Sequence, residues 1–423
     1  MTLIQVDEAL EQILAEVPLV GVERVPLADA RDRIVAEEIF SEMDLPQQPL
    51  SSMDGFAVHA EDVITATESS PVQLPVVMNI AAGTEADRPL GRSEAARIMT
   101  GAPLPMGADA IVPIEDTDAF RAEKAEPAST VQILKSAKRG AFVRAVGEEI
   151  CCGERILEKG SQLTPAALAV LATLGIAKPL LYQLPRVAII STGDELLSID
   201  QEITKAQIRE SNSLMLAALV EECGGQVLRF PIARDDLQEI RALFWNVLSQ
   251  KPDLIISSAG VSVGAADYIK DVLQELGQLN FWRVNMRPGK PLVFGQVQHI
   301  PFFGLPGNPV SAHVTFDVFA RPFLRKLGGS VAAGQRQPLM PVRAGEDFQS
   351  DGRQSYLRVN VEKRDQEWYA FATGTQSSAA LTSMLRADGL LIIEAGVREV
   401  KEGTLLKMRP LKSFPALAEA RDP

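Results

Sequence analysis

The sequence predicts a multidomain chain of the α/β-plus-β class, built around a central three-layer α/β domain. From residue 185 onward, buried strands such as 186–191 and 253–260 alternate with helices, which is the pattern of a largely parallel sheet covered by helices. Residues 51–140 hold short apolar runs broken by glycine, proline and aspartate, which indicates a β-rich second domain. After residue 329 the helical pattern gives way to short strand-like runs, which indicates a β domain at the C-terminus.

Composition excludes several classes of protein. The chain has 423 residues, of which 46% are hydrophobic and 23% charged, as in ordinary globular proteins of about three domains. The chain has a net charge of −13, whereas nucleic-acid binders usually carry an excess of positive charge. No run of about 20 apolar residues predicts a membrane span, and acidic residues near Met1 argue against a signal peptide. The three cysteines predict free thiols in a reducing cytoplasm, and no CxxC or HExxH spacing supports a zinc site.

Helices are predicted on both sides of the β-rich domain. Apolar residues in 6–14 recur at the spacing of an amphipathic helix. Residues 41–50 hold two prolines and indicate a crossing loop. Residues 161–177 predict a helix with Thr164 as its N-cap and Gly175 as its C-terminal stop. The α/β domain is expected to close with a helix over 309–327 that carries a row of phenylalanines on one face.

Acidic residues follow three strands of the predicted sheet. Glu195 follows the first strand, Asp235 the next, and Asp267 ends the small-residue loop after the third. Ligands bind at the carboxyl ends of parallel strands, and the Ser/Gly-rich loop 257–264 is suited to an oxyanion. The coincidence of these features predicts a divalent cation between carboxylates and a phosphate. A Gly-Asp-Glu run after a strand is as often a simple turn, and Asp235 or Asp267 alone is more typical of a helix cap than of a metal ligand. The loop alone is a weak signal and matches neither the GxGxxG nor the P-loop pattern.

Two stiff turns carry basic and polar groups. Residues 286–291 read MRPGKP, and residues 305–311 read LPGNPVS, where two prolines surround a Gly-Asn turn before a helix. Such groups suit a tetrahedral oxyanion, although a stiff turn beneath solvated charges is the alternative. The residues concerned are Arg283, Arg287, Lys290, Pro306, Pro309 and Ser311.

Taken in order, several motifs resemble one family. They are S-x-M-D-G-F-A, I-M-T-G-A-P, S-T-G-D-E-L, S-x-G-V-S-x-G-x-x-D, P-G-K-P and G-L-P-G-N-P-V-S. The chain resembles the bacterial molybdopterin molybdenumtransferases, which are related to the E domain of gephyrin. The resemblance implies an elongated homodimer with four domains per subunit: a discontinuous helical N-terminal domain, the β-rich second domain, an α/β molybdopterin-binding domain and a C-terminal β-barrel-like domain. Their expected bounds are 1–40 with 141–180, 41–140, 181–328 and 329–423.

The resemblance also implies an activity. Such an enzyme inserts molybdenum from molybdate into the dithiolene of adenylylated molybdopterin and releases AMP with Mg²⁺, as the final step of molybdenum cofactor biosynthesis in the cytoplasm. It would contact molybdopterin adenylyltransferase and molybdoenzyme chaperones. The matching catalytic positions are Asp54, Thr100, Glu149, Glu195, Asp235 and Asp267, of which the last three would hold the metal. The matching substrate-binding positions are Arg144, Ser262, Gly264, Arg283, Arg287, Lys290, Pro306, Pro309, Ser311, Arg353, Arg358, Ser377 and Ser378. Asp54 and Thr100 would border the partner's site.

The sequence departs from the family pattern at a few positions. Glu149 stands where Asp is usual, Ala259 replaces a glycine, and Phe56 replaces a tyrosine. Arg283 and Arg287 stand where Lys is common, and the two cations are not equivalent. Two alternative functions stay open: a molybdopterin adenylyltransferase, although that activity usually resides in the α/β domain alone, and a non-catalytic molybdopterin-binding scaffold. The preference between molybdate and tungstate also stays open.

Overall fold

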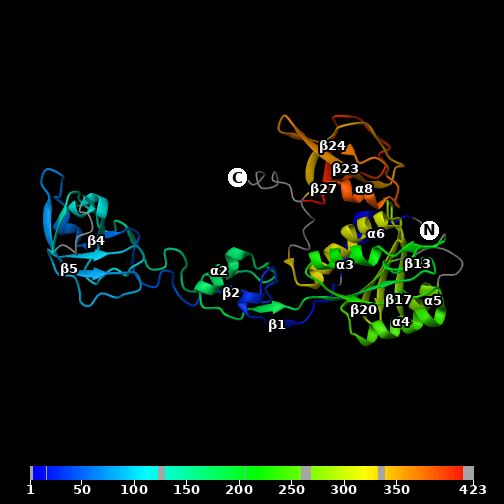
Figure 1. Ribbon diagram of the computed structural model, residues 1–423, viewed down its shortest axis with the longest axis horizontal. Helices are drawn as coiled ribbons and strands as arrows, with labels where there is room; N and C mark the ends of the chain where they lie inside the picture. The colour runs from blue at the N-terminus through cyan, green and yellow to red at the C-terminus, as the bar shows by residue number, and fades with distance from the viewer. Residues whose placement is uncertain are drawn as a thin grey trace. The chain divides into compact units, whose positions relative to one another are not determined.

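The computed structural model of the protein describes residues 3–15, 17–121, 129–204, 206–258, 268–331 and 339–412 (Figure 1). The chain divides into two compact units. The large unit comprises Met1–Glu37, Lys159–Ala172 and Ile176–Pro423, and the small unit comprises Glu38–Glu158 and Thr173–Gly175. Each unit contains its own buried apolar clusters. No helix in the described ranges is long and apolar enough to span a membrane.

The small unit contains the predicted β-rich domain. Its main sheet has the strand order β7-β4-β6-β5-β8. The bounds are Gly55–Val58 (β4), Val72–Ile80 (β5), Ala95–Ile98 (β6), Ala110–Pro113 (β7) and Thr130–Ile133 (β8). Two short ladders join distant parts of the unit: β2 (Ile39–Phe40) with β10 (Arg155–Leu157), and β3 (Leu50–Ser51) with β9 (Val143–Arg144). Short 3₁₀ turns cover Ala60–Val63, Ile114–Asp116 and Asp118–Arg121.

The N-terminal part of the large unit confirms two local predictions. Helix α1 covers Val6–Ala15, as its amphipathic spacing predicts. Helix α2 covers Pro165–Thr173 and is shorter than expected, but Thr164 does cap it, because its Oγ1 accepts the N–H of Ala167 at 3.2 Å. A short ladder pairs β1 (Val22–Arg24) with β11 (Leu180–Tyr182), and a 3₁₀ turn covers Leu27–Asp29.

The α/β domain has the three layers that the sequence predicts. Its sheet has the order β15-β12-β16-β20-β19-β17, in which the first four strands are parallel and β19 pairs antiparallel with both β20 and β17. One apolar cluster packs α3 and the segment from α6 to α7 on one face, and a second packs α4 and α5 on the other. The strands are Arg186–Ser191 (β12), Gln226–Arg229 (β15), Leu254–Ser258 (β16), Gly277–Arg283 (β17), Pro291–Val297 (β19) and Ile300–Leu305 (β20).

The helices of this domain follow the predicted alternation. They are Asn212–Glu222 (α3), Leu237–Ser249 (α4), Tyr268–Leu276 (α5), Pro309–Thr315 (α6), a π-helical turn at Phe316–Ala320 and Arg321–Leu327 (α7). Phe316, Phe319 and Phe323 are fully buried, which confirms the predicted apolar face of the 309–327 segment. A small parallel ladder joins β13 (Leu196–Leu197) to β14 (Ile208–Arg209) beside the sheet.

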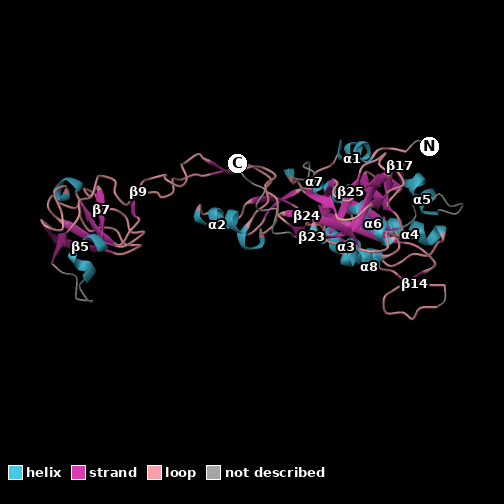
Figure 2. Cartoon of the chain, turned by 90° about the horizontal axis from the view of Figure 1, so that it is seen from above, coloured by secondary structure: helices cyan, strands magenta, loops and turns pink. Residues whose placement is uncertain are grey.

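The C-terminal domain is a closed β-barrel. Its strands are Met340–Ala344 (β21), Gln354–Arg364 (β23), Glu367–Ala372 (β24), Gly389–Ile393 (β25) and Leu405–Pro410 (β27), and the pairing of β23 with β25 closes the ring. Phe348–Gln349 (β22) pairs with Glu399–Val400 (β26), and helix α8 covers Leu381–Arg386. Strand β18 (Met286–Arg287) precedes β19 of the α/β domain and pairs in parallel with β23, so it adds a short strand to the barrel sheet. Figure 2 shows the barrel strands β23, β24 and β25 in magenta and helices α3, α6 and α8 in cyan.

Candidate functional site

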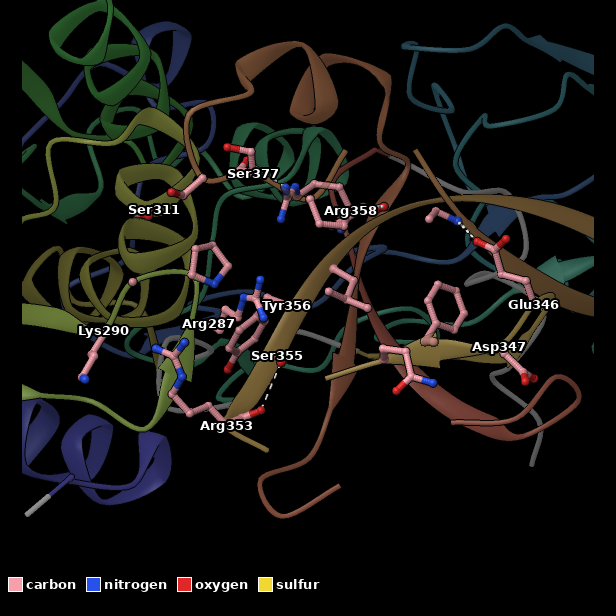
Figure 3. Close-up of a pocket in the computed structure, with 18 of the residues that line it drawn as sticks. Arg287, Lys290, Ser311, Glu346, Asp347, Arg353, Ser355, Tyr356, Arg358 and Ser377 are labelled. Carbon is pink, nitrogen blue, oxygen red and sulfur yellow. Dashed lines mark hydrogen bonds between the residues drawn. The ribbon is translucent and has the colours of Figure 1, made fainter. Parts of the chain in front are cut away.

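A cavity of about 620 Å³ lies where the α/β domain meets the barrel (Figure 3). We call it the barrel cavity. The turn after β18 and the start of α6 form one side, and strand β23 and the loop before α8 form the other. It brings together seven of the predicted substrate-binding residues, which are Arg287, Lys290, Ser311, Arg353, Arg358, Ser377 and Ser378. The cavity therefore gathers four cations and several hydroxyl groups from distant parts of the sequence, and the carboxylates of Glu346 and Asp347 also line it.

Arg358 is the most unusual of these residues. It is 1% exposed, and its guanidinium donates to Ser383 Oγ at 3.1 Å and to the Ser377 carbonyl at 3.0 Å. Burial, together with the nearby charge of Arg287, lowers the pKa of Arg358 to about 10. Within the described ranges, the groups that accept hydrogen bonds from its guanidinium are neutral. A buried cation without a carboxylate partner is costly, and an anion in the cavity would neutralise it.

Arg287 and Arg353 share one counter-ion at the cavity wall. Arg353 Nε donates to Asp351 Oδ2 at 3.0 Å, and Arg287 Nη1 lies 3.5 Å from the same oxygen. Hydrogen bonds from Arg353 hold the pKa of the Asp351 carboxyl below its ordinary value. Arg353 Nη1 also donates to the Met286 carbonyl at 3.2 Å. Arg353 therefore attaches residues 286–291, which we call the basic turn, to the barrel. The Arg287 side chain is half-exposed.

The basic turn packs closely against α6. Gly289 has φ = +103°, and a Cβ there would lie 2.5 Å from Thr315 Oγ1. Only glycine fits this position without strain. At the start of α6, the N–H of Val310 donates to the Ser378 carbonyl at 3.1 Å, and Asn308 Nδ2 donates to Ser378 Oγ at 3.2 Å. The basic turn is thus packed against α6, and the start of α6 is hydrogen-bonded to Ser378 of the C-terminal domain.

A second cavity, of about 690 Å³, lies at the carboxyl ends of β12 and β16. We call it the strand-end cavity. Of the predicted residues, Glu195 and Pro309 line it, together with Gly307 and Asn308 of the same turn. Pro306 is buried just before them. Arg283 ends β17, is exposed, and lies outside the described lining of both cavities.

Sequence reasoning missed Glu210 and Asn212, which also line the strand-end cavity. Both are buried, and Asn212 Nδ2 donates to Ser258 Oγ and to the Gly307 carbonyl at 2.8 Å each. The pattern Glu-Ser-Asn-Ser at the start of α3 predicts a helix cap and gives no sign of long-range contacts. The long-range partners of Asn212 are visible only in the folded chain.

Carboxylates gather beside the strand-end cavity. The N–H of Asp235 donates to Asp194 Oδ1 at 3.2 Å. Burial and the charges of Asp194 and Glu195 raise the pKa of Asp235. Within the described ranges no group of three or more His, Cys, Asp or Glu side chains is arranged to hold a metal ion. The predicted ligand Asp267, and the predicted contacts Ser262 and Gly264, lie outside the described residues.

Four predicted residues belong to the small unit. Asp54 Oδ1 accepts the N–H of Thr100 at 2.7 Å and its hydroxyl at 2.8 Å, and these hydrogen bonds lower the pKa of Asp54. Arg144 Nη2 lies 3.0 Å from Glu149 Oε2, so the longer Glu149 side chain forms an ion pair with Arg144. Each pair is formed within the small unit.

Three family models together match most of the chain. They are described as the MoeA N-terminal region (domain I and II) over residues 4–175, a probable molybdopterin binding domain over 188–326, and the MoeA C-terminal region (domain IV) over 341–411. A solved structure of a molybdopterin biosynthesis MoeA protein from Pyrococcus horikoshii is 32% identical, with a TM-score of 0.81, and the match covers 98% of this chain and 100% of that one.

Curated relatives agree with these models. Molybdopterin molybdenumtransferase 2 of Mycobacterium tuberculosis is 38% identical over 91% of this chain and 94% of its own length. Molybdopterin molybdenumtransferase of Nostoc is 37% identical over 90% of this chain and 87% of its own, and that of Haemophilus influenzae is 32% identical over 96% and 98%. The motifs, the fold and these similarities lead to one conclusion: the chain belongs to the molybdopterin molybdenumtransferase family, a family of transferases in molybdenum cofactor biosynthesis.

Proposed function

We propose that this protein transfers molybdenum from molybdate into the dithiolene of adenylylated molybdopterin and releases AMP. The observation that carries the proposal is Arg358, a buried cation with neutral partners beside Lys290 and Ser311. Molybdate is a tetrahedral dianion, and guanidinium, ammonium and hydroxyl donors around one cavity match its charge and shape. The barrel cavity is accordingly the proposed molybdate site, with Arg287, Arg353, Ser377 and Ser378 as further contacts.

The strand-end cavity is the proposed site of the adenylylated substrate. It lies where an α/β sheet binds ligands, and its Gly307-Asn308-Pro309 turn also holds Ser378 of the barrel cavity. A substrate seated there would present its dithiolene close to a bound oxyanion. We expect the residues to act by positioning and charge neutralisation more than by proton transfer.

Mg²⁺ is the proposed ion at the acidic residues of the strand ends. Carboxylate oxygens are the ligands that this ion prefers, and a cation would favour the charged form of Asp235, whose pKa is raised by burial and by the charges of Asp194 and Glu195. Glu195, Asp235 and Asp267 would hold it, and the ion would neutralise charge on the leaving AMP phosphate. These residues would orient the phosphate, while Lys290 and Arg358 hold the oxyanion apart from it.

The remaining family expectations are part of the same proposal. We expect a cytoplasmic homodimer in which Asp54, Thr100, Arg144 and Glu149 of one subunit border the site of the other. We also propose the four domains at the bounds 1–40 with 141–180, 41–140, 181–328 and 329–423. Molybdopterin adenylyltransferase, as the source of the adenylylated substrate, and molybdoenzyme chaperones are the proposed protein partners.

The test is AMP release from adenylylated molybdopterin with Mg²⁺, with and without molybdate. We expect molybdate-dependent release from the wild type and a rise of tenfold or more in the half-saturating molybdate concentration for Lys290→Ala. Lys407→Ala replaces an exposed lysine of the barrel and serves as the matched control. No molybdate-dependent AMP release by the folded wild type would contradict the proposal. Pyrophosphate release from ATP and molybdopterin would indicate an adenylyltransferase instead.

A further inference from the structure

Asn212 connects the end of β16 with the turn that follows β20. Strands β16 and β20 pair in parallel as far as Ser258 and Leu305. The side-chain amide of Asn212 donates one hydrogen bond to Ser258 Oγ and one to the Gly307 carbonyl, each at 2.8 Å. The Asn212 side chain therefore links the last residue of β16 to a residue that lies two positions beyond the end of β20.

The position of Asn212 is itself fixed by a buried carboxylate. Glu210 is 7% exposed, and it accepts hydrogen bonds from the N–H of Ser213 at 2.9 Å, from the hydroxyl of Ser213, and from Ser191 Oγ at 3.3 Å. Ser191 is the last residue of β12. The start of α3 is thereby attached to the end of β12, and Asn212, the first residue of α3, points toward the strand-end cavity that it lines.

From Gly307 the connection continues to the barrel cavity. The next residue, Asn308, donates to Ser378 Oγ, and Val310 donates to the Ser378 carbonyl. Ser311, one residue further on, lines the barrel cavity with Ser378. Asn212 thus supports a turn that lines the strand-end cavity and leads within a few residues to Ser311 of the barrel cavity.

We propose that Asn212 is a positioning residue that holds the 306–308 turn in the geometry needed by the adenylylated substrate; this inference rests on the proposed function. An amide is the group that meets both requirements, because Ser258 Oγ and the Gly307 carbonyl both accept a hydrogen bond from it. Aspartate at this position would place carboxylate oxygens against the Gly307 carbonyl. Alanine would leave that carbonyl without its recorded side-chain donor.

Two variants and a control test the inference. For Asn212→Ala we expect a rise of about tenfold in KM for adenylylated molybdopterin, which corresponds to the loss of one or two hydrogen bonds, and for Asn212→Asp a larger rise. The half-saturating molybdate concentration should change less than threefold, because the barrel cavity keeps its own donors. Asn246→Ala replaces an exposed asparagine of α4 and should behave as the wild type.

A second readout does not depend on activity. Amide hydrogen exchange of peptides over residues 302–316 should accelerate at least fivefold in Asn212→Ala and stay unchanged in Asn246→Ala. Faster exchange with an unchanged KM would overturn the positioning role, and unchanged exchange would overturn the structural connection itself. If the wild type releases no AMP, the proposed function fails on its own, and the exchange rates still decide whether Asn212 holds the turn.

Discussion

Replacing Arg358 by methionine should weaken molybdate binding much more than it destabilises the protein. The guanidinium is buried, and within the described ranges its hydrogen-bond partners are neutral groups. The folded protein therefore carries a desolvated charge that a bound anion would neutralise. Methionine has a similar length and no charge. The variant loses hydrogen bonds to Ser383 and Ser377, worth about 1 kcal/mol each, but it also loses the cost of burying the cation. We expect these two contributions nearly to cancel in the free protein.

Anion binding has no such compensation. A hydrogen bond to a charged group contributes roughly 1.5–3 kcal/mol, so Arg358→Met should raise the Kd for molybdate roughly 10- to 150-fold. At a molybdate concentration of about 100 times the wild-type Kd, ligand binding stabilises the wild type by about 2.7 kcal/mol. At the same concentration a variant with a hundredfold weaker Kd gains only about 0.4 kcal/mol. The difference is easily measured by titration calorimetry and by unfolding with and without molybdate.

Arg364→Met is the matched control, because Arg364 lies on the same strand with its side chain half-exposed and paired with Glu362. It should bind molybdate as the wild type does. The reasoning is refuted if Arg358→Met binds molybdate within twofold of the wild type. It is also refuted if the free variant unfolds several kcal/mol more easily, because Arg358 would then be a structural residue whose charge is already well satisfied.

Further predictions concern three other positions. Gly289→Ala should lower the free energy of unfolding by about 1–3 kcal/mol and weaken molybdate binding, because φ is positive there and the new Cβ would lie 2.5 Å from Thr315 Oγ1. Adding Thr315→Ala should restore part of the lost stability. If the changes in unfolding free energy of the two single variants, measured in urea, simply add in the double variant, the contact is contradicted. Thr100→Val removes the hydroxyl donor and keeps the backbone N–H donor, so it should raise the pKa of Asp54 part of the way toward its ordinary value, seen by NMR titration of the carboxyl group. Since the lowered pKa stabilises the wild type above the ordinary pKa of Asp, the difference in stability should vanish as the pH falls through the lowered value, and an unchanged pKa would count against the hydroxyl hydrogen bond. Asp235→Asn should raise the unfolding temperature in EDTA, because one of several like charges is removed. It should also reduce the increase in unfolding temperature that Mg²⁺ causes. An equal increase with Mg²⁺ in the wild type and the variant would exclude Asp235 as a ligand.

Local chemistry made the elements of this fold predictable, and long-range contact made parts of the site unpredictable. Thr164 and the phenylalanines of 309–327 act within a few residues of the chain, so their capping and burial follow from the sequence. Arg358 shows the opposite case. The resemblance placed it near the oxyanion, but its partners Ser377 and Ser383 lie 19 and 25 residues away, and only the closed barrel brings them to its guanidinium.

The pairing of β18 with β23 is a second feature that no local pattern predicts. It joins Met286–Arg287 to Gln354 and Ser355 across nearly seventy residues, and it turns the basic turn into part of the barrel wall. Helix α8 has six residues, too few for a periodic pattern, although its Ser383 holds Arg358. Sequence reasoning therefore named charged residues that line the barrel cavity and left unidentified Ser383 and Asp351, which hold two of them.

The 306–311 segment connects the two cavities, and this supports a transfer reaction over simple binding. Gly307, Asn308 and Pro309 line the strand-end cavity, and Ser311 lines the barrel cavity. Each cavity has cations of its own beside carboxylates: Arg287, Lys290, Arg353 and Arg358 with Glu346 and Asp347 in the barrel cavity, and Arg209 with Glu195 and Glu210 in the strand-end cavity. Two anionic substrates can therefore be bound in cavities that share one wall segment without competing for the same cations, which is the arrangement that transfer from one to the other requires.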